Sequence, residues 1–188
     1  MNRAHMEFCA SSDWRHIVEE LIMPDALRNA DLGTDVIEIG PGPGFTTEVL
    51  RPLADQLTAV EIDPGLADSL KQRLAEMGVN VVIGDATALA LPDNCFTGAA
   101  SFHMLHHIPT VDDQDRALGE LARVLKKGGL LVAADGVFSD ASLAFHEGDI
   151  YNPIDPGDLN VRLEGFGFGS VDVHLHDLGW FCTAVASE

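Results

Sequence analysis

The chain has 188 residues, of which 46% are apolar, and this is enough to bury the core of one domain. Lysine and arginine number 11 against 30 aspartate and glutamate residues, and the resulting net charge of −19 would repel a phosphate backbone. No apolar run approaches the roughly 20 residues of a membrane span, and the first residues lack the apolar stretch of a secretory signal. We therefore expect a cytoplasmic monomer or homodimer that binds neither nucleic acid nor a membrane.

The first predicted element is a helix over residues 11–23, in which apolar side chains recur at helical spacing. Its candidate capping residues are Ser12 and Asp13. Pro24 is expected to interrupt this helix, because proline lacks the N–H that a helix interior needs. We expect residues 1–30 to form an N-terminal helical segment that packs on a domain of residues 31–188.

From residue 35 onward, short apolar segments alternate with helical patterns, which is typical of a parallel sheet. The predicted strands are Asp35–Ile39, Leu57–Glu61, Val79–Ile83, Gly98–Met104 and Leu130–Ala134. The helix before the fifth strand is expected to carry Lys126 and Lys127 in its last turn, where their charges favour the helix dipole. Gly128-Gly129 is expected to end this helix.

The end of the chain departs from this alternation. After a predicted helix at Asp158–Glu164, apolar and polar side chains alternate over residues 171–175, and a second apolar segment begins at Trp180. The link at residues 176–179 is too short for a helical crossover, so these two strands should be antiparallel. The sequence thus predicts an α/β fold with a mostly parallel seven-stranded sheet, an antiparallel last strand and helices on both faces.

The segment Val36–Thr47 carries the strongest functional signal, because a buried strand leads into the turn Gly40-Pro41-Gly42-Pro43-Gly44 and then into a helix. Such a turn brings a ligand to the free N–H groups of a helix N-terminus. The G-x-G-x-G spacing differs from the G-x-G-x-x-G of dinucleotide enzymes, which argues against a nicotinamide enzyme. Taken alone, the segment is equally compatible with a tight structural turn.

Acidic residues at the ends of the next two strands extend this signal, because strand ends meet at the ligand side of an open α/β sheet. Glu61 lies 21 residues after Gly40, close to the offset of an acidic residue that accepts hydrogen bonds from ribose hydroxyls. The third strand ends at Gly84-Asp85-Ala86, and the fourth ends near His103. Glu61 alone could be a solvated strand end and Asp85 alone a helix cap, but their order along successive strands favours one site.

These segments resemble the class I S-adenosylmethionine-dependent methyltransferases of small-molecule type. Val36–Thr47 is similar to the first motif of that family, Leu57–Asp63 to its second, and Gly84-Asp85-Ala86 to its adenine-binding turn. The run Met104–Ile108 and the later run Glu120–Gly129 are similar to its closing section. The three glycines match that motif, whereas the prolines between them remove two N–H donors and stiffen the loop.

The resemblance implies S-adenosylmethionine as cofactor and S-adenosylhomocysteine as product. Glu38 and the glycine loop would hold the amino-acid end of the cofactor, Glu61 the ribose, and Asp85 the adenine. The cofactor-binding residues that it implies are Glu38, Gly40, Pro41, Gly42, Gly44, Glu61, Ile62, Asp85, Ala86 and His103.

The catalytic group and the acceptor are less constrained by the sequence. Candidates for a general base are His103, Asp135, His146 and Tyr151. His103, His106 and His107 could form a metal site, but their spacing matches no usual zinc pattern, and we favour a pocket-lining or structural role without metal. The three cysteines lack a CxxC spacing and are given no catalytic role.

The long segment Val137–Gly157 is expected to be a lid or a wall of the substrate pocket, or else to be anchored to the core by its aromatic side chains. We expect methyl transfer to a small-molecule acceptor. The alternative is a catalytically inactive protein that binds S-adenosylmethionine or S-adenosylhomocysteine and acts as a partner or sensor, with a closed or missing acceptor pocket.

Overall fold

The computed structural model describes residues 2–187, which form one seven-stranded sheet in the order β3-β2-β1-β4-β5-β7-β6. The strands are β1 (Asp35–Ile39), β2 (Gln56–Glu61), β3 (Asn80–Ile83), β4 (Phe96–Phe102), β5 (Leu125–Asp135), β6 (Phe168–His176) and β7 (Gly179–Ala186). The pairs from β3 to β5 are parallel, and β7 runs antiparallel to both β5 and β6. The predicted mostly parallel sheet with an antiparallel last strand is confirmed.

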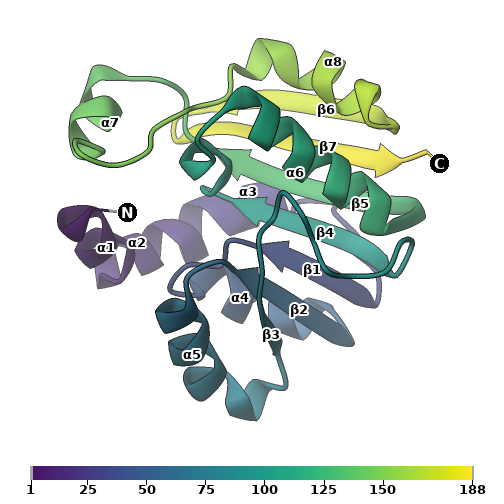
Figure 1. Cartoon of the computed structure of the whole chain (residues 1–188), viewed down its shortest axis with the longest axis horizontal. Helices are drawn as coiled ribbons and strands as arrows, with labels where there is room; N and C mark the ends of the chain where they lie inside the picture. Colours follow the sequence, from purple (N-terminus) through teal and green to yellow (C-terminus); the bar gives the residue numbers. More distant parts are fainter. Residues whose placement is uncertain (1, 188) are drawn as a thin grey trace.

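Helices cover both faces of the sheet, as predicted (Figure 1). The α-helices are α1 (Arg3–Cys9), α2 (Ser12–Ile17), α3 (Met23–Ala26), α4 (Phe45–Leu50), α5 (Pro64–Arg73), α6 (Val111–Val124), α7 (Asp140–Phe145) and α8 (Pro156–Gly165). The shorter elements are the π-helix η1 (Val18–Ile22) and the 3₁₀ helices η2 (Arg51–Leu53), η3 (Ala75–Met77) and η4 (Leu105–His107). Within residues 2–187, none of the helices is both long and apolar enough to cross a bilayer.

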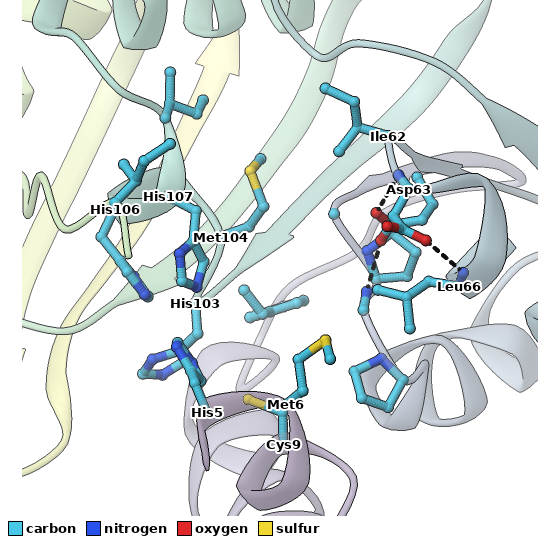
Figure 2. Close-up of a pocket in the computed structure, with 18 of the residues that line it drawn as sticks. His5, Met6, Cys9, Ile62, Asp63, Leu66, His103, Met104, His106 and His107 are labelled. Carbon is cyan, nitrogen blue, oxygen red and sulfur yellow. Dashed lines mark hydrogen bonds between the residues drawn. The ribbon is translucent and has the colours of Figure 1, made fainter. Parts of the chain in front are cut away.

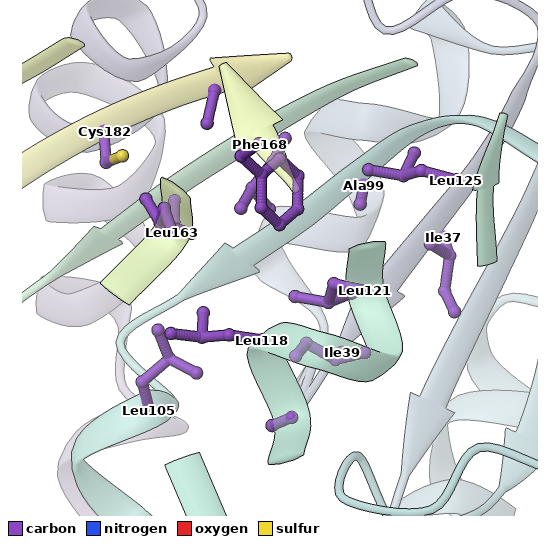
Figure 3. Packing of buried hydrophobic residues seen from close by; sticks show 14 of the residues in the cluster. Ile37, Ile39, Ala99, Leu105, Leu118, Leu121, Leu125, Leu163, Phe168 and Cys182 are labelled. Atoms are coloured by element: carbon purple, nitrogen blue, oxygen red, sulfur yellow. The ribbon is translucent and has the colours of Figure 1, made fainter. Parts of the chain in front are cut away.

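Side chains of the central strand β1 alternate between two cores, because successive residues of a strand point to opposite faces. Ile37 and Ile39 are fully buried against Leu118 and Leu121 of α6 (Figure 3). Val36 points to the opposite face and belongs to a second core with residues of η1, α3 and α4. This alternation also sends Glu38 to the α4 side, which determines its position in the site described below.

The N-terminal helical segment differs in detail from its prediction. Ser11 caps α2 by accepting a hydrogen bond from the Trp14 N–H, so the predicted caps Ser12 and Asp13 were wrong by one and two positions. Pro24 does not end the helical run, because it lies in the first turn of α3, where its missing N–H is not needed. Val18 packs against the sheet. The proposed domain boundary at residue 30 stays a prediction.

The transition from α6 to β5 also differs from its prediction. The helix ends at Val124, and the strand begins at Leu125, so the lysines and glycines of residues 126–129 lie in β5 and not in a helical turn. Leu125 is fully buried and pairs with Phe96 across the sheet, which favours an extended backbone over one more helical turn. The Lys126 ammonium lies 3.7 Å from the Asp35 carboxylate at the start of β1.

Two segments lie beyond the carboxyl ends of the parallel strands. Helix α1 and the region around α7 project from the sheet on this side, next to each other in Figure 1. The strands thereby provide the floor of a site, and these two segments provide a cover over it.

Candidate functional site

A cavity of about 740 Å³ lies at the carboxyl ends of the parallel strands, which is a volume typical of small-molecule sites. One side, the cofactor wall, consists of Gly40, Pro41, Gly42, Glu61, Ile62, Asp85 and Ala86. The other side, the roof, consists of His5, Phe8, Phe145, His146 and Tyr151. Figure 2 shows Ile62, Asp63 and Leu66 on one side of the cavity and Met104, His106 and His107 on the other.

The glycine loop requires its glycines for two different reasons. Gly40, Gly42 and Gly44 have φ angles of +63°, +52° and +83°, which L side chains rarely adopt. A Cβ on Gly40 would lie 1.9 Å from Cγ of Met104, so this position is filled by the protein itself. A Cβ on Gly42 would meet nothing within 4 Å, so the backbone here faces open space in which a ligand can approach.

Glu38 does not line the cavity, although the family resemblance assigns it to the cofactor. It is 1% exposed and accepts hydrogen bonds from the hydroxyls of Thr46 and Thr47 in the first turn of α4, at 2.6 Å for Thr47. Burial raises the pKa of this carboxyl to about 7. Glu38 therefore fixes the helix that follows the glycine loop, and a direct role toward a ligand stays a prediction.

Glu61 lies at the end of β2 and joins the glycine loop to the next turn. Its carboxylate accepts hydrogen bonds from the Gly42 N–H at 3.1 Å and from the Asp63 N–H at 2.9 Å. A carboxylate has about four acceptor positions, so two remain for the hydroxyls of a ligand. Ile62 beside it is 66% exposed and offers an apolar surface to a flat ring.

Asp85 follows β3 and lies at the same edge of the sheet. Its Oδ1 atom accepts hydrogen bonds from both the N–H and the hydroxyl of Thr87, each at 2.8 Å. Both bonds use one carboxylate oxygen and leave acceptor capacity on the other. The structure thus brings Glu61, Asp85 and the open side of Gly42 to one wall, in the order that the sequence predicts.

His103 lies between the cofactor wall and the N-terminal helices. Its φ angle is +51°, and its N–H donates to the Ala134 carbonyl at 2.8 Å, which holds the chain in this turn after β4. The imidazole packs edge-on against the Trp14 indole with ring centroids 5.2 Å apart. Burial lowers the pKa of His103, so its ring is neutral near pH 7 and able to accept a proton.

The roof is formed by two segments that are about 140 residues apart in the chain. The Asn2 side-chain amide donates to the carbonyls of Phe145 and Glu147 at 2.9 and 3.2 Å, and the Asn2 N–H donates to the Asp149 carboxylate at 2.9 Å. Above the cavity, the rings of Phe8 and Phe145 meet with centroids 5.6 Å apart. The segment Val137–Gly157 is thus a wall of the cavity that is bound to the N-terminal helix.

The other candidates for a general base fall into two groups. His146 and Tyr151 line the cavity and stack on each other with ring centroids 4.4 Å apart. Asp135 does not line it, because it is 1% exposed and lies behind His106. It accepts hydrogen bonds from His106 Nδ1 at 2.5 Å and from the His106 N–H at 3.0 Å, so it can act on a ligand only through His106.

A sequence profile of the methyltransferase domain family matches residues 37–133, which is more than half of the chain and runs from β1 to β5. The chain belongs to this family. The methyltransferase domain is of class I, and its cofactor is S-adenosylmethionine, as the sequence resemblance predicts.

The curated relatives of this methyltransferase domain include proteins with different acceptors. It is 34% identical over 111 residues to 2-methyl-6-phytyl-1,4-hydroquinone methyltransferase 1 of Oryza sativa subsp. japonica, over 56% of the chain and 33% of that protein. It is 39% identical over 80 residues to a probable ribosomal RNA small subunit methyltransferase A of Methanothermobacter thermautotrophicus, over 42% of the chain and 29% of that protein. The chain thus spans about a third of the length of these relatives.

Solved structures support the fold of the methyltransferase domain over nearly its whole length. A protein of Pyrococcus horikoshii OT3 superposes with a TM-score of 0.78 and covers 96% of this chain and 94% of its own. The sequences of the two chains are only 14% identical, so this likeness concerns the fold alone.

Several residues that support the glycine loop or line the cavity were missed at the level of sequence. The Arg73 guanidinium donates to the Pro43 carbonyl of the glycine loop and pairs with Glu48, and Arg15 lies over the Phe45 ring at 4.3 Å. His5 and Phe8 were missed because nothing in the local pattern of α1 shows that this helix reaches the roof. Their role depends on contacts with residues 145–149, which no short motif encodes.

Proposed function

We propose that this methyltransferase domain transfers a methyl group from S-adenosylmethionine to a small, largely apolar acceptor bound under the roof. The observation that carries the proposal is the extent of the cavity, which continues from the glycine loop to the aromatic side chains of Phe8, Phe145 and Tyr151. Its volume of about 740 Å³ leaves room for a small acceptor beside S-adenosylmethionine.

The residues of the cofactor wall act by holding and orienting. The open backbone at Gly42 and the carboxylates of Glu61 and Asp85 lie at three successive strand ends, where they can fix one elongated ligand. S-adenosylmethionine supplies a methyl group that is already activated by its sulfonium. The roof excludes water, and neutral His103 is able to accept a proton where the acceptor loses one.

Two alternatives make different demands on the cavity. A cofactor-binding protein without turnover needs no space beyond the cofactor, whereas this cavity extends to the roof. A ribosomal RNA acceptor, as named for one relative, has to reach the cofactor past a surface with a net charge of −19. The extent of the cavity favours an enzyme with an acceptor over an inactive binding protein. The negative charge favours a small acceptor over RNA.

The first test is calorimetric titration with S-adenosylmethionine and S-adenosylhomocysteine. We expect Glu61→Gln and Asp85→Asn to weaken binding by about tenfold or more, the loss of one good hydrogen bond. Asp158→Asn, which changes an exposed carboxylate on α8, should leave binding unchanged. Equal affinities in all four proteins would refute the assigned cofactor wall.

The acceptor class is then tested with a radiolabelled methyl group on the cofactor. We expect label in small organic-soluble products when a panel of quinols, phenols and amines is offered. Label in RNA would contradict the small-molecule proposal. Tight cofactor binding without label in any acceptor would favour the inactive binding protein.

A further inference from the structure

Four histidines from three separate segments converge at the roof side of the cavity. His5 belongs to α1, His106 and His107 to η4, and His146 directly follows α7. One ring nitrogen from each lies within 4.8 Å of the corresponding nitrogens of the others. Figure 2 shows the rings of His5, His106 and His107 on the same side of the cavity.

Three of these side chains carry a buried nitrogen without a hydrogen-bond partner in the described residues. The atoms are His5 Nδ1, His106 Nε2 and His146 Nε2, on residues that are 5%, 6% and 7% exposed. The His5 Nδ1 atom lies 3.6 Å from the Asp149 carboxylate, which is longer than a hydrogen bond. Because an unsatisfied buried polar atom costs about 1–3 kcal/mol, three in one cluster need an explanation.

The other ring nitrogens of two members are held by the protein. His106 Nδ1 lies 2.5 Å from the Asp135 carboxylate, and His146 Nδ1 lies 2.6 Å from the Ser142 carbonyl. Both partners accept hydrogen bonds, so each Nδ1 carries a proton, and in the neutral form of the ring each Nε2 presents a lone pair to the cluster. Metal-binding histidines are oriented in this way by carboxylates and carbonyls.

We propose that His5, His106, His107 and His146 bind one divalent transition-metal ion at the roof of the cavity. Four imidazoles suit Zn²⁺, Cu²⁺, Fe²⁺ or Ni²⁺, and they do not suit the hard ions Mg²⁺ and Ca²⁺. Tetrahedral Zn²⁺ with Zn–N bonds of 2.0–2.1 Å needs nitrogens about 3.4 Å apart, so nitrogens that lie within 4.8 Å of one another have to approach by at most about 1.4 Å.

The electrostatics of the cluster are compatible with this ion. Burial, together with neighbouring histidines, lowers the pKa of His5 to about 4 and that of His107 to about 3. Both rings are therefore neutral near pH 7, which is the form that coordinates metal. The carboxylates of Asp135 and Asp149 lie next to His106 and His5 and supply negative charge near the cation.

The ion would fasten the roof to the sheet. Its ligands join α1 and the residue after α7 to η4, which follows β4, so the two segments of the cover would be tied to the floor of the cavity. The expectation of no metal considered only the histidines His103, His106 and His107. His103 packs against Trp14 and does not belong to the cluster. The cluster contains His5 and His146 in addition to His106 and His107.

The experiment uses the untagged chain, stripped of metal with a chelator and studied without cofactor or acceptor. Zn²⁺ is titrated in competition with a chromophoric chelator, and Co²⁺ binding is followed by visible absorption. We expect one ion per chain with the intense visible bands of tetrahedral Co²⁺. His106→Ala and His5→Ala should weaken Zn²⁺ binding by about 100-fold or more, because each removes a ligand. His16→Ala, which changes an exposed histidine on α2, should not change it.

Unchanged Zn²⁺ affinity in His106→Ala and His5→Ala, or no binding by the natural chain, would overturn the proposal. His5 lies on a helix outside the sheet, so His5→Ala decides the matter if His106→Ala fails to fold. A second readout is thermal unfolding, where Zn²⁺ should raise the melting temperature of the natural chain and of His16→Ala but not that of His5→Ala. Neither measurement involves methyl transfer, so the metal proposal can be tested even if no methyl transfer is detected.

Discussion

The two sides of the cavity are built by different means. The cofactor wall consists of backbone and carboxylates at the ends of β1, β2 and β3, whose relative positions follow from parallel register. The roof consists of aromatic and imidazole side chains on two segments outside the sheet, which are joined to each other by Asn2. The comparison suggests that the fold determines where the cofactor lies, whereas the roof determines which acceptor fits.

The largest loss of stability is expected from Gly40→Ala in the cofactor wall. The φ of +63° costs about 1–2 kcal/mol for an L side chain, and the new methyl group would overlap the Met104 side chain. Overpacking adds about 1–3 kcal/mol, so we expect a loss of about 3 kcal/mol in the free energy of unfolding. Urea unfolding measures it.

Gly42→Ala is the matched control, because Gly42 has a similar positive φ but no atom within 4 Å of the added Cβ. We expect a loss of only about 1–2 kcal/mol in stability, from the backbone alone. The added methyl group would project where the cofactor is proposed to lie, so the affinity for S-adenosylmethionine should fall. Equal losses of stability in the two variants would contradict the assignment of Gly40 to packing and Gly42 to ligand contact.

A second effect is expected from pH and concerns Glu38, the buried carboxyl that holds the helix after the glycine loop. Burial raises the pKa of Glu38 from 4.5 to about 7, so the folded chain binds this proton more tightly than the unfolded chain. Stability from this group is fully present below pH 4.5 and is lost as pH rises through about 7. We expect Glu38→Gln to remove this loss, which is about 3 kcal/mol between pH 4.5 and 8.

The measurement is urea unfolding of the natural chain and of Glu38→Gln at several pH values. The difference in unfolding free energy between the two proteins should change across this window, because the other titrating groups are common to both. Parallel pH profiles would show that Glu38 titrates normally in the folded chain, contrary to its burial beside Thr46 and Thr47.

The difference between the two sides also explains what the sequence could predict. The strands of the cofactor wall are short apolar segments, and their predicted bounds lie within about two residues of those observed, apart from β5. The glycine loop and Glu61 follow from local spacing, because each depends on its own strand and turn. Their meeting at one edge follows from parallel topology, which the alternation of strands and helices indicates.

The roof was not predictable in the same way. The sequence indicated that residues 137–157 form a lid or wall, but the contact with α1 joins residues that are about 140 positions apart. No periodicity or spacing in either segment encodes such a contact, and the approach of His5 to His146 depends on it. The extension of β5 was missed because the pairing of Leu125 with Phe96 outweighs the local preference for a helix end at two glycines.

A smaller effect is expected from Phe145→Ala in the roof. Phe145 is 37% exposed and touches the rings of His5 and Phe8, so its removal should cost about 1–2 kcal/mol of stability. Because Phe145 does not belong to the cofactor wall, the affinity for S-adenosylmethionine should stay unchanged, while the KM for the acceptor rises. Calorimetry and steady-state kinetics with an acceptor found in the panel measure the two effects.

Val161→Ala on α8 is the control for this variant, since Val161 is 74% exposed and lies outside the cavity. It should change neither the KM for the acceptor nor the affinity for the cofactor. A loss of cofactor affinity in Phe145→Ala as large as the change in KM would mean that the two sides of the cavity do not have separate roles.

The smallest effect concerns the connection between the two halves of the roof. Asn2 caps α1 by accepting a hydrogen bond from the His5 N–H, and its side-chain amide donates to the carbonyls of Phe145 and Glu147. Asn2→Asp keeps the cap and loses both donated bonds, whereas Asn2→Ala loses all three. We expect Asn2→Asp to cost less than about 1 kcal/mol of global stability.

Hydrogen exchange can detect this change where global unfolding cannot, because local opening of the roof leaves the sheet intact. In Asn2→Asp, amides of α1 and α7 should exchange faster than in the natural chain, and those of β1 and β4 should not. A carboxylate at the N-terminus of α1 would by itself stabilise the helix, so faster exchange would be due to the two lost donated bonds and to repulsion between the new carboxylate and the two carbonyl oxygens. Unchanged exchange in α7 would mean that the two bonds donated by the Asn2 amide do not hold the roof, and that the ring contacts and the bond from the Asn2 N–H to Asp149 are sufficient.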